Sequence, residues 1–229
     1  MTNSTLPLTQ HPGVWRASEG RHQDTTQRQD TGFAALNTAL GGGFPASGLI
    51  RLRSLCGVGE LSLLKTVLGQ NNSEKLLVFI NPPGQIHQAW LHQMAINPAN
   101  VTVVHCRSGD EALWAAEQCL KSEACYQVLL WHDAITTKQA RRLQVASTQH
   151  RLRCLLFENK RVQRIALPLT LDLDIQAVTG GLQIDITKNR GAWPTSATQL
   201  MFCYTPTNQA IYRAMDNTSA LHALSHIAG

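Results

Sequence analysis

LIRLRSLCGVGELSLL, residues 49–64, combines three signals in a fixed order. An apolar segment with strand character ends at Leu55, two closely spaced glycines follow, and a second apolar run then begins. A strand, a glycine loop and a helix in this order are typical of a phosphate-binding loop. Glu60, however, follows the second glycine, where such loops have a lysine. The segment therefore predicts a strand–loop–helix unit whose chemistry has changed.

In the full pattern, G-x-x-x-x-G-K-[ST], backbone N–H groups surround the phosphates, the lysine neutralises them and the hydroxyl holds magnesium. With Gly59 as the second glycine and Gly57 inside the loop, Ser54 replaces the first glycine. Glu60 replaces the lysine and Leu61 replaces the hydroxyl residue. The sequence thus lacks the first glycine, the cation and the metal ligand.

The charge reversal at Glu60 decides whether a phosphate is expected here. Two unit charges about 4 Å apart interact by about 4 kcal/mol at an effective dielectric constant near 20. A helix N-terminus favours an anion by only about 0.3–2 kcal/mol. We therefore expect no nucleotide, and we expect Glu60 to cap the helix end itself. The alternative is an ordinary glycine turn that never bound phosphate, and it does not predict an ATPase either.

Strands and helices alternate along the rest of the chain. Further strands are predicted at residues 75–80, 101–106, 126–131 and 153–158, and helices at 34–40, 85–95, 110–122 and 137–149. Four such alternations favour a mainly parallel sheet covered by helices on both faces. After Glu158 the helical pattern stops, and residues 167–175, 180–191 and 197–205 predict an antiparallel extension of the sheet.

The length of 229 residues and the hydrophobic content of 43% fit one α/β domain. We expect a flexible polar arm at residues 1–30, the domain at 31–205, and a loosely attached tail at 206–229. No apolar run reaches the roughly 18 residues that span a bilayer, and the N-terminus lacks the features of a secretory signal. The expected location is the cytoplasm, without membrane contact.

The six cysteines include no C-x-x-C pair, so they are expected to be small buried side chains in a reducing compartment. His222 and His226 have the i, i+4 spacing of a metal-binding pair, but no third ligand accompanies them. We therefore expect no metal site.

Several segments resemble known proteins. TGFAALNTALGGGFPASGLIRLRSLCGVGELSLL (31–64) resembles the entry segment of the RecA family, in which T-G-x-x-x-L-D-x-A-L-G-G-G precedes a strand, a phosphate loop and a helix. VWRASEG (14–20), EALWAAEQCLKSEACYQVLLW (111–131) and ITKNRGAW (186–193) resemble the ImuA family, the RecA-like accessory proteins of bacterial mutagenic translesion synthesis. The SulA cell-division inhibitors share a shorter core, centred on 111–131.

The resemblance implies an α/β, RecA-like three-layer domain with a mainly parallel central sheet and a C-terminal antiparallel extension. RecA-type ATPases position the attacking water with a glutamate after the next strand, where this chain has Pro83. They end the magnesium-side strand with an acidic residue, where this chain has His132, with Asp133 one residue later. The resemblance therefore implies a pseudo-ATPase without a cofactor, and not an enzyme.

Candidate binding residues lie in three places. Trp15 and Arg16 suit a docking arm, because such side chains dominate binding hot spots, although Trp15 folding back onto its own sheet is an alternative. By resemblance, Lys188 and Arg190 lie on a subunit-contact edge, or else at a solvated hairpin end. Weak phosphate contacts are considered for a basic set, most simply interpreted as a solvated face: Arg141, Arg142, Lys160, Arg161 and Arg164. The segments around this set leave little room for the DNA-binding loops of RecA.

We interpret the chain as a non-hydrolysing adaptor in an SOS-type DNA damage response. The resemblance implies that it supports error-prone translesion synthesis by binding an ImuB-like polymerase homologue, RecA or both. The alternative is a SulA-like inhibitor that binds FtsZ and blocks cell division. Residues 14–20 and the full loop segment extend beyond the SulA core and favour the first interpretation.

Overall fold

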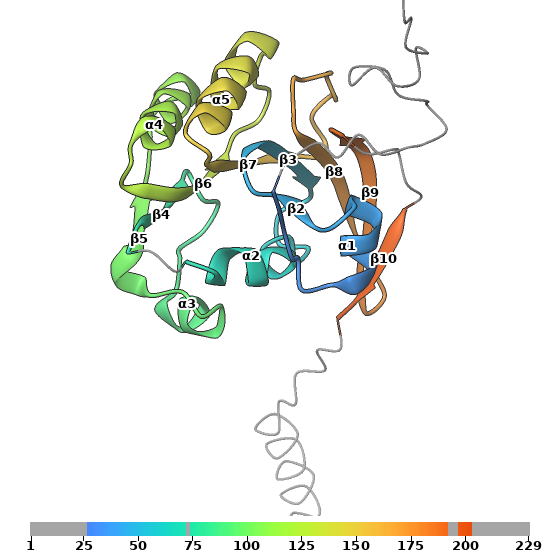
Figure 1. Cartoon of the computed structure of the whole chain (residues 1–229). Helices are drawn as coiled ribbons and strands as arrows, with labels where there is room; N and C mark the ends of the chain where they lie inside the picture. The colour runs from blue at the N-terminus through green and yellow to red at the C-terminus, as the bar shows by residue number, and fades with distance from the viewer. Residues whose placement is uncertain (1–26, 72–73, 192–196, 203–229) are drawn as a thin grey trace, which may run out of the picture.

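The computed structural model describes residues 27–71, 74–191 and 197–202 (Figure 1). The helical segments are α1 (Ala34–Leu40), η3 (Ser62–Leu64), α2 (Lys65–Gly69), α3 (Gln88–Gln93), η4 (Pro98–Asn100), α4 (Gly109–Lys121) and α5 (Thr137–Gln149). The strands are β1 (Arg28–Gln29), β2 (Phe44–Pro45), β3 (Gly48–Ser54), β4 (Leu76–Ile80), β5 (Val101–Val104), β6 (Cys125–Trp131), β7 (Arg153–Asn159), β8 (Leu171–Val178), β9 (Gly181–Asn189) and β10 (Thr198–Met201).

The central sheet has eight strands in the order β10-β9-β8-β3-β7-β6-β4-β5. The six strands from β8 to β5 run parallel, and β9 and β10 continue the sheet antiparallel to their neighbours. This arrangement confirms the predicted mixed α/β class, with a largely parallel sheet and antiparallel strands at the C-terminal side. Because parallel strands end at the same edge, Ser54, Trp131 and Asn159 are brought together there.

Helices cover both faces of the sheet (Figure 1). On one face, α1, α2 and α3 pack on a core that includes Leu52, Phe79 and Leu155. On the other face, α4 and α5 pack on a second core that includes Val128 and Leu156. Alternate residues of each strand enter opposite cores, as the period of two for a strand requires.

The two longest helices begin at side-chain caps. Ser108 accepts a hydrogen bond from the Glu111 N–H at the start of α4. At α5, Thr136 accepts from the Gln139 N–H, and the Gln139 side chain accepts from Thr136 in return, which forms a capping box. Such caps satisfy N–H groups that lack partners within a helix, so they explain why these two predicted helices begin where they do.

Three details differ from the sequence expectations. Residues 28–29, within the segment expected to be a flexible arm, form β1 and pair with Phe44–Pro45, while residues 1–26 lie outside the described chain. The predicted strand at 167–175 begins only at Leu171, because residues 160–170 form a connector packed beside the sheet. The helical pattern of residues 110–122 also predicts a core position for Trp114, but this residue is 61% exposed on α4.

None of the helices in the described ranges has the length and apolar character needed to cross a bilayer. Within the same ranges, no group of three or more His, Cys, Asp and Glu side chains is arranged to hold a metal ion. His222 and His226 lie outside the described residues.

Candidate functional site

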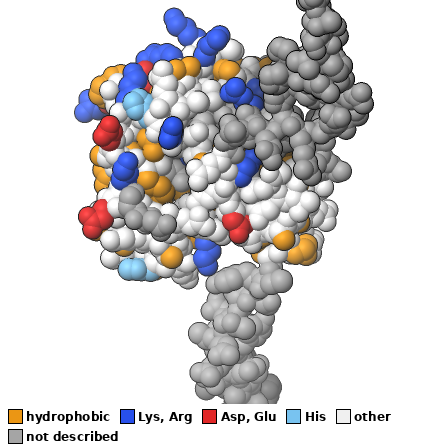
Figure 2. All heavy atoms as spheres, in the orientation of Figure 1, with side chains coloured by type: hydrophobic (Ala, Val, Ile, Leu, Met, Phe, Trp, Pro, Cys, Tyr) orange, Lys and Arg blue, Asp and Glu red, His pale blue; other side chains and the backbone are white. Residues whose placement is uncertain are grey.

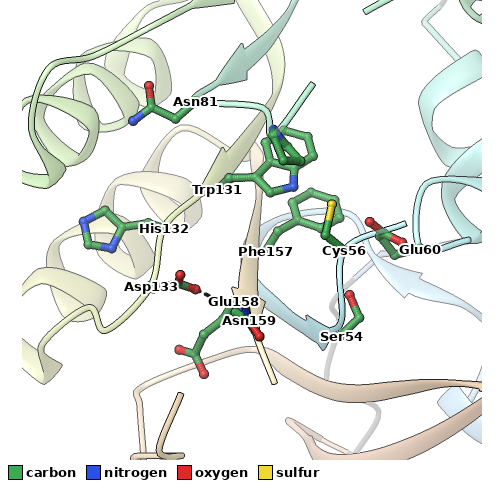
Figure 3. A pocket seen from close by; sticks show the side chains of 11 residues that line it. Ser54, Cys56, Glu60, Asn81, Trp131, His132, Asp133, Phe157, Glu158 and Asn159 are labelled. Atoms are coloured by element: carbon green, nitrogen blue, oxygen red, sulfur yellow. Dashed lines mark hydrogen bonds between the residues drawn. The ribbon is translucent and has the colours of Figure 1, made fainter. Parts of the chain in front are cut away.

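An open hollow of about 280 Å³ lies at the carboxyl edge of the parallel strands, where α/β proteins commonly bind ligands (Figure 3). Glu60 and Cys56 lie on one side of it, His132 and Asp133 lie on the other, and Phe157 lies between them. The full lining is Ser54, Cys56, Glu60, Asn81, Pro83, Trp131, His132, Asp133, Phe157, Glu158 and Asn159. Residues of the glycine loop therefore lie at the same hollow as Pro83 and His132.

The Glu60 carboxylate closes the glycine loop from within. Its Oε1 accepts a hydrogen bond from the Gly57 N–H, and its Oε2 accepts one from the Gly59 N–H, each at 3.1 Å. Both glycines have positive φ, 81° and 106°, which few other residues adopt without strain. The side chain of Glu60 is 5% exposed. An internal anion thus accepts the backbone N–H groups that a phosphate-binding loop would direct at its ligand.

The expectation that Glu60 caps the following helix is wrong in its detail. The loop leads first into the short 3₁₀ turn η3, and the five-residue helix α2 begins only at Lys65. The residue before α2, Leu64, makes no side-chain capping bond. Glu60 therefore stabilises the loop itself. Because α2 has only five residues, its dipole contributes little at the loop.

The hollow has a negative lining. It includes three carboxylates, Glu60, Asp133 and Glu158, and its described lining contains neither Lys nor Arg. Asp133 Oδ1 accepts the Asn159 N–H at 2.8 Å, so Asp133 ties the end of β6 to the end of β7 (Figure 3). A phosphate placed here would meet these carboxylates, and the nearest arginines, Arg51 and Arg53, are already paired with Glu158, which disfavours its binding.

Pro83 and His132, the two positions that the RecA resemblance compares with catalytic residues, both line this hollow. Pro83 follows β4 and has no side chain able to orient water. His132 follows β6, its backbone N–H donates to the Phe157 carbonyl, and its Nδ1 is buried without a partner among the described residues. Gly109, at the start of α4, lies so close that an added Cβ would come within 2.6 Å of His132 Nε2. His132 is thus wedged against α4.

Aromatic rings form one wall of the hollow. Trp131 stacks on Phe157 with ring centroids 4.3 Å apart and planes 7° apart, and Phe79 stacks on Trp131 at 6.1 Å. Trp131 and Phe157 are register partners on β6 and β7, whereas Phe79 of β4 pairs with Leu129, two residues before Trp131 and on the same face of the sheet. Stacked aromatics of this kind stabilise the sheet edge, and Trp131 is half-buried against the core.

Cys56 is exposed beside the glycine loop, which corrects the expectation of a buried thiol for this cysteine. Partial burial, followed by the charge of Glu60, raises the pKa of the Cys56 thiol above its usual value. The thiol therefore stays protonated at neutral pH and is a weak nucleophile. Of the others, Cys125 and Cys154 are buried as expected, and Cys203 lies outside the described residues.

A buried network of charges lies next to the hollow. Arg51 of β3 donates to Asp172 of β8 at 2.7 and 3.0 Å and contacts Glu158 of β7 at 3.4 Å. Arg53 donates to Glu158 at 2.6 Å. Burial lowers the pKa of Arg51, but Asp172 and Glu158 outweigh this effect and leave the pKa above its usual value. Both arginines are therefore neutralised inside the fold.

This network was not predicted from the sequence. The sequence does contain a hint of it, because charged residues interrupt the otherwise apolar strands LIRLRS and LDLDI. The local sequence of a strand does not specify which strands lie beside it. The sheet order β7-β3-β8 places the carboxylates on either side of the two arginines.

The connector at residues 160–170 is held by the same network. Arg164 pairs with Asp172 and with Asp174, each at 2.8 Å. Arg53 donates to the Val162 carbonyl at 2.6 Å, and Arg51 donates to the Ile165 carbonyl at 3.2 Å. Arg164 is therefore occupied by internal ion pairs, which contradicts its proposed role as a free phosphate contact.

The other basic candidates lie on two elements. Lys160 is half-buried and Arg161 is exposed on the connector, whereas Arg141 and Arg142 lie exposed on α5. Arg142 pairs with Glu117 of α4, so its charge is partly neutralised within the fold.

Lys188, near the end of β9, and Arg190, directly after the strand, are exposed. Lys188 donates its ammonium group to the Leu167 carbonyl at 3.1 Å, and the Arg190 carbonyl accepts from Arg28 at 3.2 Å. Lys188 thus has a local structural partner, which agrees with the alternative of a surface hairpin end. Trp15 and Arg16 lie outside the described residues.

No protein-family model matches the chain, and no curated protein sequence matches it significantly. Among solved structures, the chain is similar to the crystal structure of SulA from Pseudomonas aeruginosa, with a TM-score of 0.42 and 18% sequence identity. The match extends over 48% of this chain and 97% of that one.

Proposed function

We propose that the chain is a non-hydrolysing, RecA-like adaptor in an SOS-type DNA damage response. In this proposal it supports error-prone translesion synthesis by binding an ImuB-like polymerase homologue, RecA or both. The proposal rests on the sequence resemblance of residues 31–64, 111–131 and 186–193 together with the geometry of the loop. Its chemistry is recognition of proteins, without turnover of a nucleotide.

The observation that supports it most is the position of the Glu60 carboxylate. Glu60 accepts the N–H groups of Gly57 and Gly59, so a triphosphate would have to displace an anion already bound by the loop. Displacement would leave Glu60, which is 5% exposed, without its hydrogen bonds in a buried place. The nearest arginines, Arg51 and Arg53, are neutralised by carboxylates and offer no compensating charge.

The connector at residues 160–170 gives independent support for an adaptor that does not form a RecA-type filament on DNA. RecA binds DNA with long mobile loops on this side of the sheet, a property that the resemblance would imply here. In this chain the connector is held by Arg51, Arg53 and Arg164. The link from β6 to α5 consists of residues 132–136 alone.

Calorimetric titration tests the first half of the proposal. The chain titrated with millimolar Mg-ATP is expected to give no binding heat. Glu60→Ala frees two loop N–H groups, so this variant is expected to bind pyrophosphate more tightly than the wild type does. Micromolar, magnesium-dependent ATP binding by the wild type that is lost on changing Glu60 would overturn the proposal.

Recovery of partners from damaged cells tests the second half. The tagged chain is expected to recover an ImuB-like protein or RecA, and deletion of the gene is expected to lower damage-induced mutagenesis. Recovery of neither protein, together with unchanged mutagenesis, contradicts the adaptor role.

The same segment 111–131 supports one alternative, a SulA-like inhibitor that binds FtsZ. Overexpression separates the two functions, because only the inhibitor is expected to produce filamentous cells. Filaments, with recovery of FtsZ and unchanged mutagenesis on deletion, would favour this alternative.

A further inference from the structure

The surface between α4 and α5 exposes apolar side chains that the fold does not use. Trp114 of α4 is 61% exposed, and Val145 of α5 is 46% exposed. Two adjoining hollows of about 200 and 390 Å³ lie along these helices, and both are lined by Glu117 and Arg142. We call this surface the α4–α5 groove. An exposed Trp beside a hollow is a recurrent feature of protein-binding hot spots.

The groove lies between one stripe of α4 and a wider face of α5. Its lining is Asp110, Leu113, Trp114, Glu117 and Lys121 of α4, with Lys138, Gln139, Arg141, Arg142, Leu143, Val145, Ala146 and Gln149 of α5. The α4 residues follow i, i+3, i+4, i+7, i+11 spacing, which places them on a single face of that helix. Each helix has 13 residues and is therefore about 20 Å long. This length matches a partner helix of about four turns.

The charges in the groove are not balanced. Glu117 is paired with Lys121 of the same helix and, across the groove, with Arg142 of α5. Lys138 and Arg141, one turn apart on α5, have no ion-pair partner among the described residues. Figure 2 shows Lys and Arg side chains gathered at the upper edge of the molecule, over the region of α4 and α5. An acidic partner would therefore form ion pairs with Lys138 and Arg141.

The mixed composition favours a protein over a nucleic acid. Asp110 and Glu117 lie in the groove itself, and such carboxylates oppose a phosphate backbone. Nucleic-acid interfaces are strongly positive, whereas protein interfaces combine an aromatic and Arg-containing centre with a polar rim. Trp114 lines the smaller hollow, Arg142 lines both hollows, and Lys138 and Arg141 line the larger one, a composition that fits the second description.

We infer that the α4–α5 groove binds an acidic amphipathic helix of a partner protein, with an apolar residue of that helix packed on Trp114. Apolar residues at i, i+3 or i+4 and i+7 of the partner would face Trp114 and Val145, and its acidic residues would pair with Lys138 and Arg141. This inference goes beyond the proposed function, because it assigns a surface and the chemistry of its occupant.

Fluorescence anisotropy with a labelled amphipathic peptide of about four helical turns tests the inference. The probe has Leu at the facing positions and Glu elsewhere, and its control replaces every Glu with Lys. The full-length chain is expected to bind the acidic peptide at least about tenfold more tightly than the basic one. Trp114→Ala is expected to weaken acidic-peptide binding at least about tenfold, the effect of losing a hot-spot aromatic.

Matched variants identify the cause of any loss. Arg141→Glu is expected to weaken binding of the acidic peptide and to strengthen binding of the basic peptide. Arg161→Glu makes the same change of net charge on the connector and is expected to leave the binding of both peptides unchanged. Leu55→Ala removes another exposed apolar side chain and is also expected to have no effect. Thermal unfolding of each variant establishes that it is folded.

Any of three peptide results would overturn the inference: equal binding of both peptides, unchanged acidic-peptide binding by Trp114→Ala, or equal effects of Arg141→Glu and Arg161→Glu. A fourth result would also overturn it: the chain binds a single-stranded oligonucleotide more tightly than the acidic peptide, and Trp114→Ala loses this binding. That result would assign the groove to nucleic acid. None of these measurements depends on ATP or on the cellular partners, so failure here is distinct from failure of the proposed function.

Discussion

The hollow at the glycine loop and the α4–α5 groove lie in the same domain, but they differ in whether their charged groups are paired and their apolar groups covered. In the hollow, Glu60 and Asp133 accept backbone N–H groups, and Glu158 is paired with buried arginines. In the groove, Lys138 has no ion pair among the described residues, and Trp114 is exposed. The carboxylates of the hollow are thus satisfied within the fold, whereas the exposed apolar and cationic side chains of the groove can still gain contacts with a partner.

Arg51→Met gives the largest expected effect, because it removes a fully buried cation from two carboxylates. Loss of one partner from a buried ion pair leaves an uncompensated charge, so the free energy of unfolding should fall by about 3–5 kcal/mol. Urea unfolding followed by circular dichroism measures it. The exposed Arg161→Met is the control and should change the value by less than about 0.5 kcal/mol. A loss below about 1 kcal/mol for Arg51→Met would show that the network contributes little.

Glu60→Gln tests whether the loop depends on its internal anion. The amide has one acceptor oxygen and no charge, so one charge-assisted hydrogen bond is lost and the other is weakened. The free energy of unfolding should fall by about 1–2 kcal/mol. The exposed Glu123→Gln is a matched control without a described partner and should behave as the wild type. Identical unfolding curves for Glu60→Gln and Glu123→Gln would mean that the charge of Glu60 does not stabilise the loop.

Tyr126→Phe tests how firmly the short helix after the loop is attached, since the Tyr126 hydroxyl donates to the Leu68 carbonyl of α2. Loss of this bond should lower stability by about 1 kcal/mol at neutral pH. Burial, opposed weakly by Arg153, raises the pKa of Tyr126 to about 12.

The folded state therefore holds the phenol proton more strongly than the unfolded state does. This stabilisation is complete below about pH 10, the ordinary pKa of tyrosine, and is lost as the pH rises towards 12. The wild type, but not Tyr126→Phe, should lose this contribution in urea unfolding between about pH 10 and pH 12. A parallel decline in both proteins would contradict the raised pKa.

Trp114→Ala should have the smallest effect on folding, because most of the ring lies in solvent. The free energy of unfolding is expected to change by less than about 0.5 kcal/mol, as for other surface substitutions. Leu113→Ala, the buried neighbour on the same helix, should cost about 2–5 kcal/mol. Similar losses in both variants would mean that Trp114 is a packing residue, and the contrast between hollow and groove would disappear.

The sequence by itself determined the order of strands and helices and the character of the loop. Helices 34–40 and 137–149 agree residue for residue with α1 and α5, since periodicity and caps are local signals. The charge reversal at Glu60 is equally local, because a phosphate loop needs a cation at that one position.

Only the tertiary structure decided how distant residues meet. Arg51, Glu158 and Asp172 are far apart in the chain, and the sheet order alone makes them partners. Trp114 follows the buried Leu113, and one residue rotates a helix position by about 100°. Whether that neighbouring position is covered depends on where α5 packs, which no local pattern specifies.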